Sequence, residues 1–228
     1  MSESIVAQTE TGLDGRRARG DASRRSVLTY ATDLVSVEGL DGLSIGRLAD
    51  VSGHSKSSIA GLFQNKAGLQ LATVDAGRAV FMAVVVEPAR EHPRGLPRLV
   101  ALMHHLIEYS RTRVFTGGCF FAAVSADFDS KPGPVRDAVR AAMSDWYGYV
   151  EAQVRYAAES GELALDADGI ELLAFELPAL YEQANARSLL YGGDSPYAIA
   201  ARGMCDRLLG AGADAATLAV LEQPRTGE

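Results

Sequence analysis

The sequence predicts an all-α protein with two domains: an N-terminal three-helix domain that contains a helix-turn-helix, and a C-terminal domain of longer helices. Apolar residues recur every three to four positions over long segments, whereas alternation of Val, Ile and Thr at every second position is almost absent. The 228 residues have an ordinary globular composition, 47% hydrophobic and 22% charged. Such a chain is long enough to bury a core in one or two domains.

The first helix is predicted from about Ala22 to Val37. Gly39 follows it and is expected to end it. Residues 1–19 have no basic start followed by an apolar core, so we do not expect a secretory signal there, but a flexible arm. The apolar residues that recur on one face of the predicted helix are Val27, Leu28, Ala31, Leu34 and Val35.

The segment 43–69 predicts a helix-turn-helix. Gly53 lies where the chain turns sharply, which a residue without Cβ does at low cost, and Ser55 can cap the helix that follows. That second helix has a polar first turn, and Ile59 and Phe63 attach it to a core. Two helices joined by a turn of about three to four residues, the second with a polar N-terminal face, are suited to placing the second helix in the major groove of DNA.

The rest of the chain predicts six more helices, bounded by glycine, proline and capping residues. Pro88 is expected to end the first of them, and the tail from Gly210 is expected to fray. We therefore predict a DNA-binding domain over 20–70 and a helical domain over 71–210, with 1–19 and 211–228 flexible. The predicted helices run over about Lys66–Val86, Leu96–Val114, Cys119–Phe128, Val135–Ser160, Ala167–Tyr191 and Ser195–Leu209.

The distribution of charge favours a nucleic-acid partner at one end of the molecule. The formal net charge of -7 argues against such a partner when the chain is taken as a whole. Between Arg16 and Gln70, however, eight Lys and Arg residues stand against five Asp and Glu residues, and the remainder carries the acid. A basic end on an acidic body attracts DNA at that end only. The alternative, a solvated N-terminal face, would be preferred without the helix-turn-helix.

Other chemistry-bearing residues predict neither a metal site nor an enzyme. Cys119 and Cys205 form no CxxC pair, so we expect no disulfide framework and no zinc site. The adjacent His104 and His105 point to different faces of a helix and cannot chelate one metal. No base, nucleophile and oxyanion donors converge in the pattern, so no catalytic residue and no cofactor is expected. No apolar run reaches the about 18–20 residues that span a bilayer, which predicts a cytoplasmic protein without a membrane partner.

Residues 23–74 resemble the head of the tetracycline-repressor (TetR) family of bacterial transcriptional regulators. The family's head has a glycine after its first helix, a glycine turn, a Ser-Lys-rich start to the second short helix, an aromatic residue near the end of that helix, and a Ser/Asn-Lys-Glu-x-Leu motif. The matching positions are Gly39, Gly53, Ser55-Lys56-Ser57-Ser58-Ile59, Phe63 and Asn65-Lys66-Ala67-Gly68-Leu69.

Three positions depart from the family's pattern. Ala60 stands where the family commonly has Tyr or Phe, Gly61 where a His or another polar residue is common, and His54 where Val or Leu is common. The missing aromatic ring removes a usual phosphate contact or packing anchor. Gly61 also lowers helix propensity by about 1 kcal/mol relative to Ala. These differences put DNA affinity and operator choice in question rather than the fold.

Recognition of DNA needs contacts that position the protein on phosphates and contacts that read base edges. Base reading is assigned to the first turn of the second helix, that is, to Lys56, Ser57 and Ser58. A solvated arginine is an equally good interpretation of Arg47, and helix capping also explains Ser44. Contacts with the DNA backbone are assigned to the surrounding polar residues Ser44, Arg47, His54, Ser55 and Lys66.

One such head reads only a few base pairs, so specific binding calls for a homodimer whose heads lie about one helical turn of DNA, or a multiple of it, apart. The resemblance implies that the last two long helices form the contact. These apolar stripes also suit packing inside one chain, and the two uses do not exclude each other. The candidate interface residues are Leu177, Leu180, Ala184, Leu189, Ile199, Met204 and Leu208.

The resemblance also implies an apolar pocket in the C-terminal domain that binds a small molecule and shifts the spacing of the heads. Aromatic walls with few polar groups are typical of such pockets, although each residue taken alone is also explained by ordinary core packing. The candidate lining residues are Phe81, Met103, His104, Phe120, Phe121, Trp146, Tyr149, Phe175 and Tyr181.

Together these observations predict a bacterial, nucleoid-associated transcriptional regulator, a repressor whose binding to double-stranded operator DNA responds to a small, largely apolar ligand in a ligand-binding and dimerisation domain. Two alternatives remain: a helical small-molecule carrier or enzyme with a non-functional head, and a protein-interaction module that no longer binds DNA. Sequence-dependent and salt-sensitive DNA binding distinguishes the first interpretation from the other two.

Overall fold

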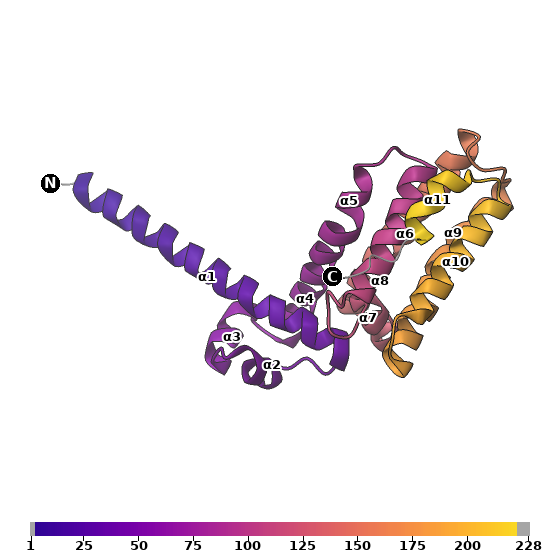
Figure 1. Cartoon of the computed structure of the whole chain (residues 1–228). Helices are drawn as coiled ribbons and strands as arrows, with labels where there is room; N and C mark the ends of the chain where they lie inside the picture. The colour runs from indigo at the N-terminus through magenta and orange to yellow at the C-terminus, as the bar shows by residue number, and fades with distance from the viewer. Residues whose placement is uncertain (1–2, 223–228) are drawn as a thin grey trace.

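The computed structural model describes the backbone of residues 3–222 and the side chains of residues 18–221. Within that range every regular element is a helix, as the sequence predicts (Figure 1). The elements are α1 (Glu3–Glu38), α2 (Ile45–Ser52), α3 (Lys56–Phe63), α4 (Lys66–Phe81), η1 (Met82–Val86), α5 (Glu87–Arg90), α6 (Leu96–Arg111), α7 (Phe120–Phe128), α8 (Pro134–Glu159), α9 (Ala167–Tyr191), α10 (Ser195–Gly210) and α11 (Ala215–Glu222).

The head is formed by the second half of α1 together with α2, α3 and the start of α4, and the other helices form the body (Figure 1). The core is continuous from one to the other, with Val27 and Leu48 fully buried in the head and Leu99 and Met204 fully buried in the body. The core apolar residues expected in the first helix are largely buried, including Val35 at 0% exposure.

Both ends of the chain contain more helix than the sequence predicted. Helix α1 begins at Glu3 rather than Ala22, because no proline interrupts this stretch and a helix once formed extends more easily than it nucleates. The expected flexible tail contains α11, which packs against α6 and buries Leu218 and Leu221. These leucines are three residues apart and share one helix face, which explains the packing. Residues 1–2 and 223–228 lie outside the described residues.

The helix expected to end near Val86 continues to Arg90 as α4, η1 and α5. Pro88 lacks an N–H group, and its ring crowds the carbonyl of Val84 four residues earlier. The helix accommodates the proline in a π-helical turn, in which the Glu87 N–H donates to the carbonyl oxygen of Met82. By length and composition this helix would be able to cross a membrane, but 50% of its apolar window is buried inside the molecule, as in the core helix of a soluble protein.

The loop between α6 and α7 attaches the body to α1. The Thr116 N–H donates to Asp33 Oδ1 at 2.7 Å, and the Gly117 N–H donates to Ser36 Oγ at 2.9 Å. A Cβ at Gly117 would lie 1.9 Å from the carbonyl oxygen of Ser36. The head and the body therefore meet through a backbone contact that only glycine permits.

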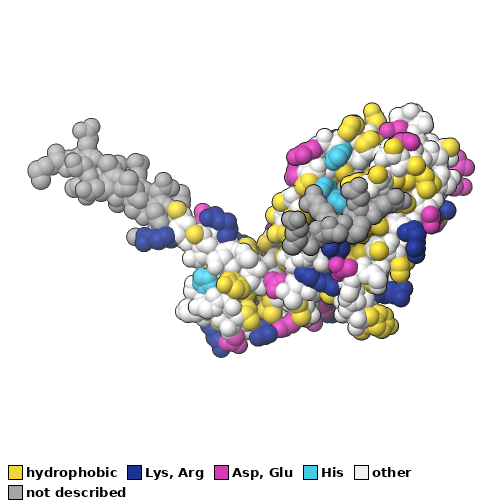
Figure 2. Space-filling view, in the orientation of Figure 1, with side chains coloured by type: hydrophobic (Ala, Val, Ile, Leu, Met, Phe, Trp, Pro, Cys, Tyr) yellow, Lys and Arg dark blue, Asp and Glu magenta, His cyan; other side chains and the backbone are white. Residues whose placement is uncertain are grey.

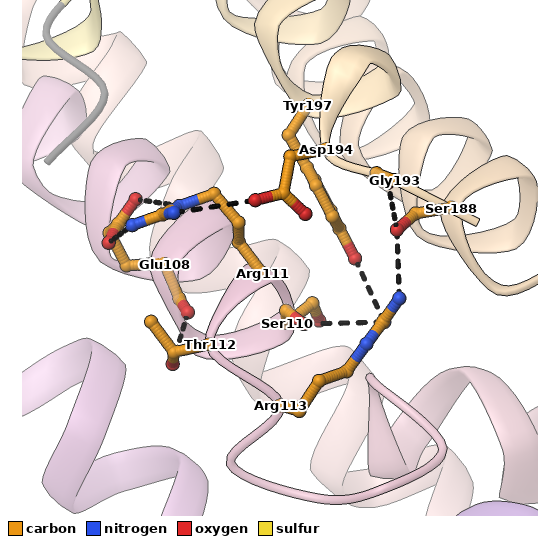
Figure 3. Close-up of polar contacts among 9 residues, drawn as sticks. All are labelled: Glu108, Ser110, Arg111, Thr112, Arg113, Ser188, Gly193, Asp194 and Tyr197. Atoms are coloured by element: carbon orange, nitrogen blue, oxygen red, sulfur yellow. Dashed lines mark hydrogen bonds and ion pairs between the residues drawn. The ribbon is translucent and has the colours of Figure 1, made fainter. Parts of the chain in front are cut away.

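The same end of α6 is fastened to the connection between α9 and α10 (Figure 3). Arg111 pairs with Glu108 at 2.6 Å and reaches Asp194 at 3.5 Å. Arg113 Nη2 donates to Ser188 Oγ at 2.8 Å. The segment that holds α1 is thus also bonded to the last two long helices.

Candidate nucleic-acid interface and body cavity

The two short helices of the head begin with side-chain caps and are separated by a glycine turn. Ser44 Oγ accepts the N–H of Arg47 at 3.1 Å at the start of α2, and Ser55 Oγ accepts the N–H of Ser58 at 3.1 Å at the start of α3. Gly53 ends α2 with a φ of 70°, in the left-handed region that glycine adopts without strain. Each of these positions has the local role that the sequence predicted.

The outer face of α3 is built from small side chains. Ser57, Ala60 and Gly61 are exposed at helical spacing, while the apolar residues of α3 are buried on the opposite face. A Cβ at Gly61 would meet no atom within 4 Å, so the fold itself does not require glycine there. Lys56 lies exposed beside this face and has no ion-pair partner among the described residues. Small residues and a cation without a partner suit the close approach of a polyanion.

Two of the cations assigned to the DNA backbone are engaged inside the protein. Arg47 Nε donates to Glu38 Oε1 at 3.0 Å and its Nη2 lies 2.5 Å from the same oxygen. This hydrogen bonding lowers the pKa of Glu38 and raises the pKa of Arg47. Lys66 Nζ donates to the carbonyl oxygen of Asp41 at 2.8 Å. Either side chain would have to share or exchange these partners to contact phosphate.

Helix α1 contacts the helix-turn-helix through side chains that reach its turn and the end of α3. The His54 Nε2 atom lies 3.2 Å from Ser26 Oγ, which places this ring between the turn and α1. Arg24 Nη1 donates to the carbonyl oxygen of Leu62 at 2.7 Å, and its guanidinium lies 4.5 Å from the centroid of the Phe63 ring. In the sequence Arg24 stands out only as one of several positive charges near the N-terminus. Its structural role could have been expected because the last carbonyls of a helix need donors.

The basic side chains of the head lie on α1 and along the edge formed by α2 and α3 (Figure 2). Acidic side chains are mixed among them and continue over the body. The local excess of positive charge therefore lies at a small number of positions. Lys56 on α3 is one of them, and no acidic side chain among the described residues pairs with it.

A cavity of about 520 Å³ lies in the body between the α4–η1–α5 helix, α7, α8 and α9. Its interior carries aromatic rings in edge-to-face contact. The centroids of Phe81 and Trp146 are 5.0 Å apart, and those of Phe81 and Phe121 are 5.9 Å apart. Five of the residues predicted for a pocket line this cavity: Phe81, Phe121, Trp146, Tyr149 and Tyr181.

The other four predicted pocket residues lie elsewhere. Met103 is fully buried in α6, which other helices surround, and Phe120 is fully buried with its ring against Gly77. His104 borders a second hollow, of about 430 Å³, between α6 and α10. Phe175 is 74% exposed on the outer face of α9. Composition identified these residues correctly as apolar or aromatic, but not the helix face on which each one lies.

Several lining residues were missed by the sequence analysis. Ala142 and Met143 line the cavity from α8, one helical turn before Trp146. Spacing relative to Trp146 would have indicated them, because residues three and four apart share a helix face. Ser125 and Glu182 also line the cavity, and no local pattern distinguishes them from solvated polar residues.

Two polar residues of the cavity lining, Cys119 and Tyr181, carry no charge at neutral pH. The hydroxyl groups of Tyr181 and Ser110 are hydrogen-bonded to each other, and Cys119 contacts Tyr181 from α7's capping position. Burial raises the pKa of the Cys119 thiol and raises that of Tyr181 well above its ordinary value, the latter helped by the neighbouring thiol. Both groups therefore stay protonated, and these two side chains offer an occupant no charge.

Helix α7 joins the cavity to the head. Asp127 Oδ2, at its C-terminal end, accepts the N–H of Asp41 at 2.7 Å in the turn between α1 and α2. Lys131 pairs with Asp127 at 2.7 Å and with Asp41 at 3.1 Å. Burial by itself would raise the pKa of Asp127, but hydrogen bonds from Lys131 and from backbone N–H groups of the turn outweigh burial and lower that pKa. Gly39 leaves space for this carboxylate, which would lie 3.0 Å from a Cβ there.

Helix α4 binds the same turn from the other side. The buried Gln70 side chain donates to the carbonyl oxygen of Leu40 at 2.8 Å, and Lys66 donates to Asp41 as described above. Because α4 continues into the cavity wall at Arg78 and Phe81, two walls of the cavity hold one turn of the head.

The residues predicted for a dimer contact divide into two groups. Leu177, Ala184, Met204 and Leu208 are buried inside the chain, and Leu180 is half-buried. Leu189 and Ile199 are exposed, and the outer face of α9 and α10 carries further exposed apolar side chains (Figure 2). These are Leu172, Phe175, Leu190, Tyr191 and Leu209.

Comparison with known proteins finds matches over both the sequence and the fold. Residues 95–204 match the family model of the tetracyclin repressor-like C-terminal domain. A TetR transcriptional regulator from Chloroflexus aurantiacus J-10-FL is 22% identical, with a TM-score of 0.70 over 84% of this chain and 95% of the other. A TetR-family regulator from Agrobacterium tumefaciens is 20% identical, with a TM-score of 0.73 over 82% and 98%.

A third similar structure is that of AibR in complex with isovaleryl coenzyme A and operator DNA. It is 19% identical, with a TM-score of 0.60 over 72% of this chain and 85% of AibR. No match was found among proteins of curated function. The sequence match lies in the body, and the structural matches cover 72–84% of this chain and show its overall fold.

Proposed function

We propose that this chain, which belongs to the TetR family by its C-terminal domain and its fold, represses transcription under the control of a small molecule. Proteins of this family are DNA-binding transcription regulators rather than enzymes. To this family-level role we add three proposals for this chain: that it represses transcription, that a small molecule controls it, and that it acts as a homodimer. A regulator of this kind acts where the DNA is, so we expect it in the cytoplasm.

The DNA contacts are assigned to α3 and its surroundings. The small exposed face formed by Ser57, Ala60 and Gly61 allows the backbone of α3 to enter the major groove, and Lys56 supplies a charge that no described acid neutralises. Ser44 and Ser55 cap the starts of α2 and α3, where helix N-termini favour phosphate. Ser58 lies in the first turn of α3 and is assigned to base reading together with Lys56 and Ser57. Arg47, His54 and Lys66 are assigned to phosphates of the DNA backbone. To reach them, these side chains give up some of the hydrogen bonds that they now make within the protein.

The homodimer is assigned to the outer face of α9 and α10. Phe175 and Leu190 are each 74% exposed there, and exposed apolar patches of this kind mark interaction surfaces. The buried predicted residues, such as Met204 and Leu208, support the face from inside rather than contacting a partner. A second copy placed on this face would present two heads to one duplex.

Ligand control is assigned to the two cavity walls that bind the turn at residues 39–42. The proposal depends on this arrangement. Helices α4 and α7 both line the cavity. Both also hydrogen-bond to this turn, α4 through Gln70 and α7 through Asp127. An occupant that moves either wall changes the position of the turn, and with it the start of α2. AibR, a protein of the same fold, has been captured with both isovaleryl coenzyme A and operator DNA, which gives a precedent for the two binding functions on this architecture.

Selection of duplexes from a random-sequence library tests this proposal. The full chain is expected to enrich a sequence with two related half-sites, and its affinity for the selected duplex should fall steeply with salt. Recovery of no preferred sequence at low salt would contradict the repressor. Binding of small molecules without DNA selection would instead favour the carrier interpretation.

A further inference from the structure

Two buried hydroxyl groups on the cavity wall lack a hydrogen-bond partner within the described part of the chain. They are Ser125 Oγ on α7 and Tyr149 OH on α8. Most buried polar side chains in proteins are hydrogen-bonded, and leaving a hydroxyl without a partner destabilises the folded state. Both groups belong to residues that line one cavity, so an occupant whose polar groups reach them would supply the missing partners.

The charged groups around this cavity are already balanced. Arg78 pairs with Asp145 at 2.7 Å, and Arg90 pairs with Glu87 at 2.7 Å. Glu182 Oε1 accepts the hydroxyl of Tyr147 at 2.9 Å. Two arginines and two carboxylates line the space, so an ion of either sign would meet as much repulsion as attraction. An uncharged occupant avoids the loss of hydration that a buried charge suffers.

The rest of the wall is suited to flat, apolar rings. Phe81 stands edge-to-face against both Trp146 and Phe121, with interplanar angles of 83° and 88°. Met82 and Met143 also line the cavity, and methionine side chains adapt to the edge of an aromatic group. The volume of about 520 Å³ falls in the range of drug-sized ligand sites.

We propose that the cavity binds an uncharged molecule with an aromatic or alicyclic ring system and a hydroxyl or carbonyl group that hydrogen-bonds to Ser125 and Tyr149. The ring system packs among Phe81, Phe121 and Trp146. Each of the two side-chain hydroxyl groups can donate to a carbonyl or hydroxyl oxygen of the ligand, and each can accept from a ligand hydroxyl. This assignment rests on the proposed function, because it names the class of molecule that would control the regulator.

Three probes of nearly equal size separate the possible classes. Calorimetric titration of the full chain with 2-naphthol, 2-methylnaphthalene and 2-naphthoate compares a neutral hydroxyl, no polar group and an anion on one ring system. The neutral hydroxyl is expected to bind about tenfold more tightly than either of the others. Tighter binding of 2-naphthoate, equal binding of 2-methylnaphthalene, or binding of none of the three would each overturn the proposal.

Substitution of the two hydroxyl groups supplies a second readout. Tyr149→Phe and Ser125→Ala should each weaken 2-naphthol binding about fivefold and leave 2-methylnaphthalene binding unchanged. The same variants should melt at the same or a higher temperature than the wild type when no ligand is bound, because each removes an unsatisfied buried hydroxyl. Tyr156→Phe is the matched control, since Tyr156 is exposed and lies outside this cavity.

The two kinds of failure are distinguishable. A variant that melts lower than the wild type and binds 2-naphthol as well as the wild type would show a structural hydroxyl and overturn the assignment. These titrations contain no DNA. Their failure therefore contradicts the ligand class, whereas failure to select a duplex contradicts the proposed function.

Discussion

The head and the cavity of the body differ in how their polar groups are satisfied. In the head, Ser44 and Ser55 cap helices, and Arg47 and Lys66 are bonded to acidic residues or carbonyls of the same chain. In the cavity, two buried hydroxyl groups lack a partner among the described residues. An exposed surface can exchange its internal hydrogen bonds for phosphate contacts at little cost, whereas a buried hydroxyl gains a partner only when a ligand enters. The first arrangement is suited to reversible binding of a polyanion, the second to selection of a small molecule.

The head and the body are joined by two contacts, and these contacts differ in the groups that form them. The loop between α6 and α7 meets α1 through backbone groups at Gly117, a contact with no tolerance for a side chain. The turn between α1 and α2 is held by the side chains of Asp127, Gln70 and Lys66. We therefore expect the first contact to act as a fixed joint and the second as the adjustable one.

The largest expected effect is that of Gly117→Ala, which tests the fixed joint. The new Cβ would lie 1.9 Å from the carbonyl oxygen of Ser36, so either the loop or α1 must move. We expect a loss of about 3 kcal/mol or more in the free energy of unfolding, measured in urea. Gly148→Ala is the control, because a Cβ there meets no atom within 4 Å. Equal stability of the two variants would show that the joint is not rigid.

Next in size is Lys56→Ala, which tests whether the head binds DNA through α3. Affinity for the selected duplex should fall about tenfold, and the slope of log affinity against log salt should become shallower by about one if Lys56 contacts phosphate. Arg140→Ala removes the same charge from an exposed position on α8 and should leave binding near that of the wild type. An unchanged affinity in the Lys56 variant would remove this residue from the interface.

A smaller effect is expected from Asp127→Asn, which tests the adjustable contact. Because the pKa of Asp127 is lowered in the folded chain, its charge contributes stability that is fully present above about pH 5 and is lost as the pH falls below about 4. The variant should be less stable than the wild type by about 1 kcal/mol at pH 7, and the gap should close near pH 3. Urea unfolding at pH 7 and at pH 3 measures the difference in stability between the two proteins. A difference of the same size at pH 3 would argue against this role of the charge.

The head could be predicted from the sequence because its structure is local. Ser44, Gly53 and Ser55 act on neighbours within four residues, so their spacing alone predicts the turn and both caps. The ends of the chain were harder, since α11 forms only because Leu218 and Leu221 find a place on α6.

The cavity depends on helix faces that meet only after folding. Phe81, Trp146 and Tyr181 were predicted from their size and aromatic character, but the same criterion wrongly included Phe120 and Phe175. Asp127 was not assigned to a site, because the N–H group that it accepts belongs to Asp41, 86 residues away in the sequence. Ser125 was not assigned either, because only the folded chain shows that its hydroxyl is buried without a partner among the described residues. Long-range contacts of this kind leave no mark in local spacing.

Filling the cavity of the body should change the binding of DNA by the head. Ala142 lines the cavity, and its neighbour Ala141 is exposed and lies outside it, so Ala142→Phe places a ring in the cavity while Ala141→Phe adds the same ring to the surface. Affinities for the selected duplex, measured by fluorescence anisotropy, are predicted to differ by at least about fivefold between Ala142→Phe and the wild type, and to be unchanged in Ala141→Phe. Equal affinity of all three folded proteins would contradict the coupling between the cavity and the head.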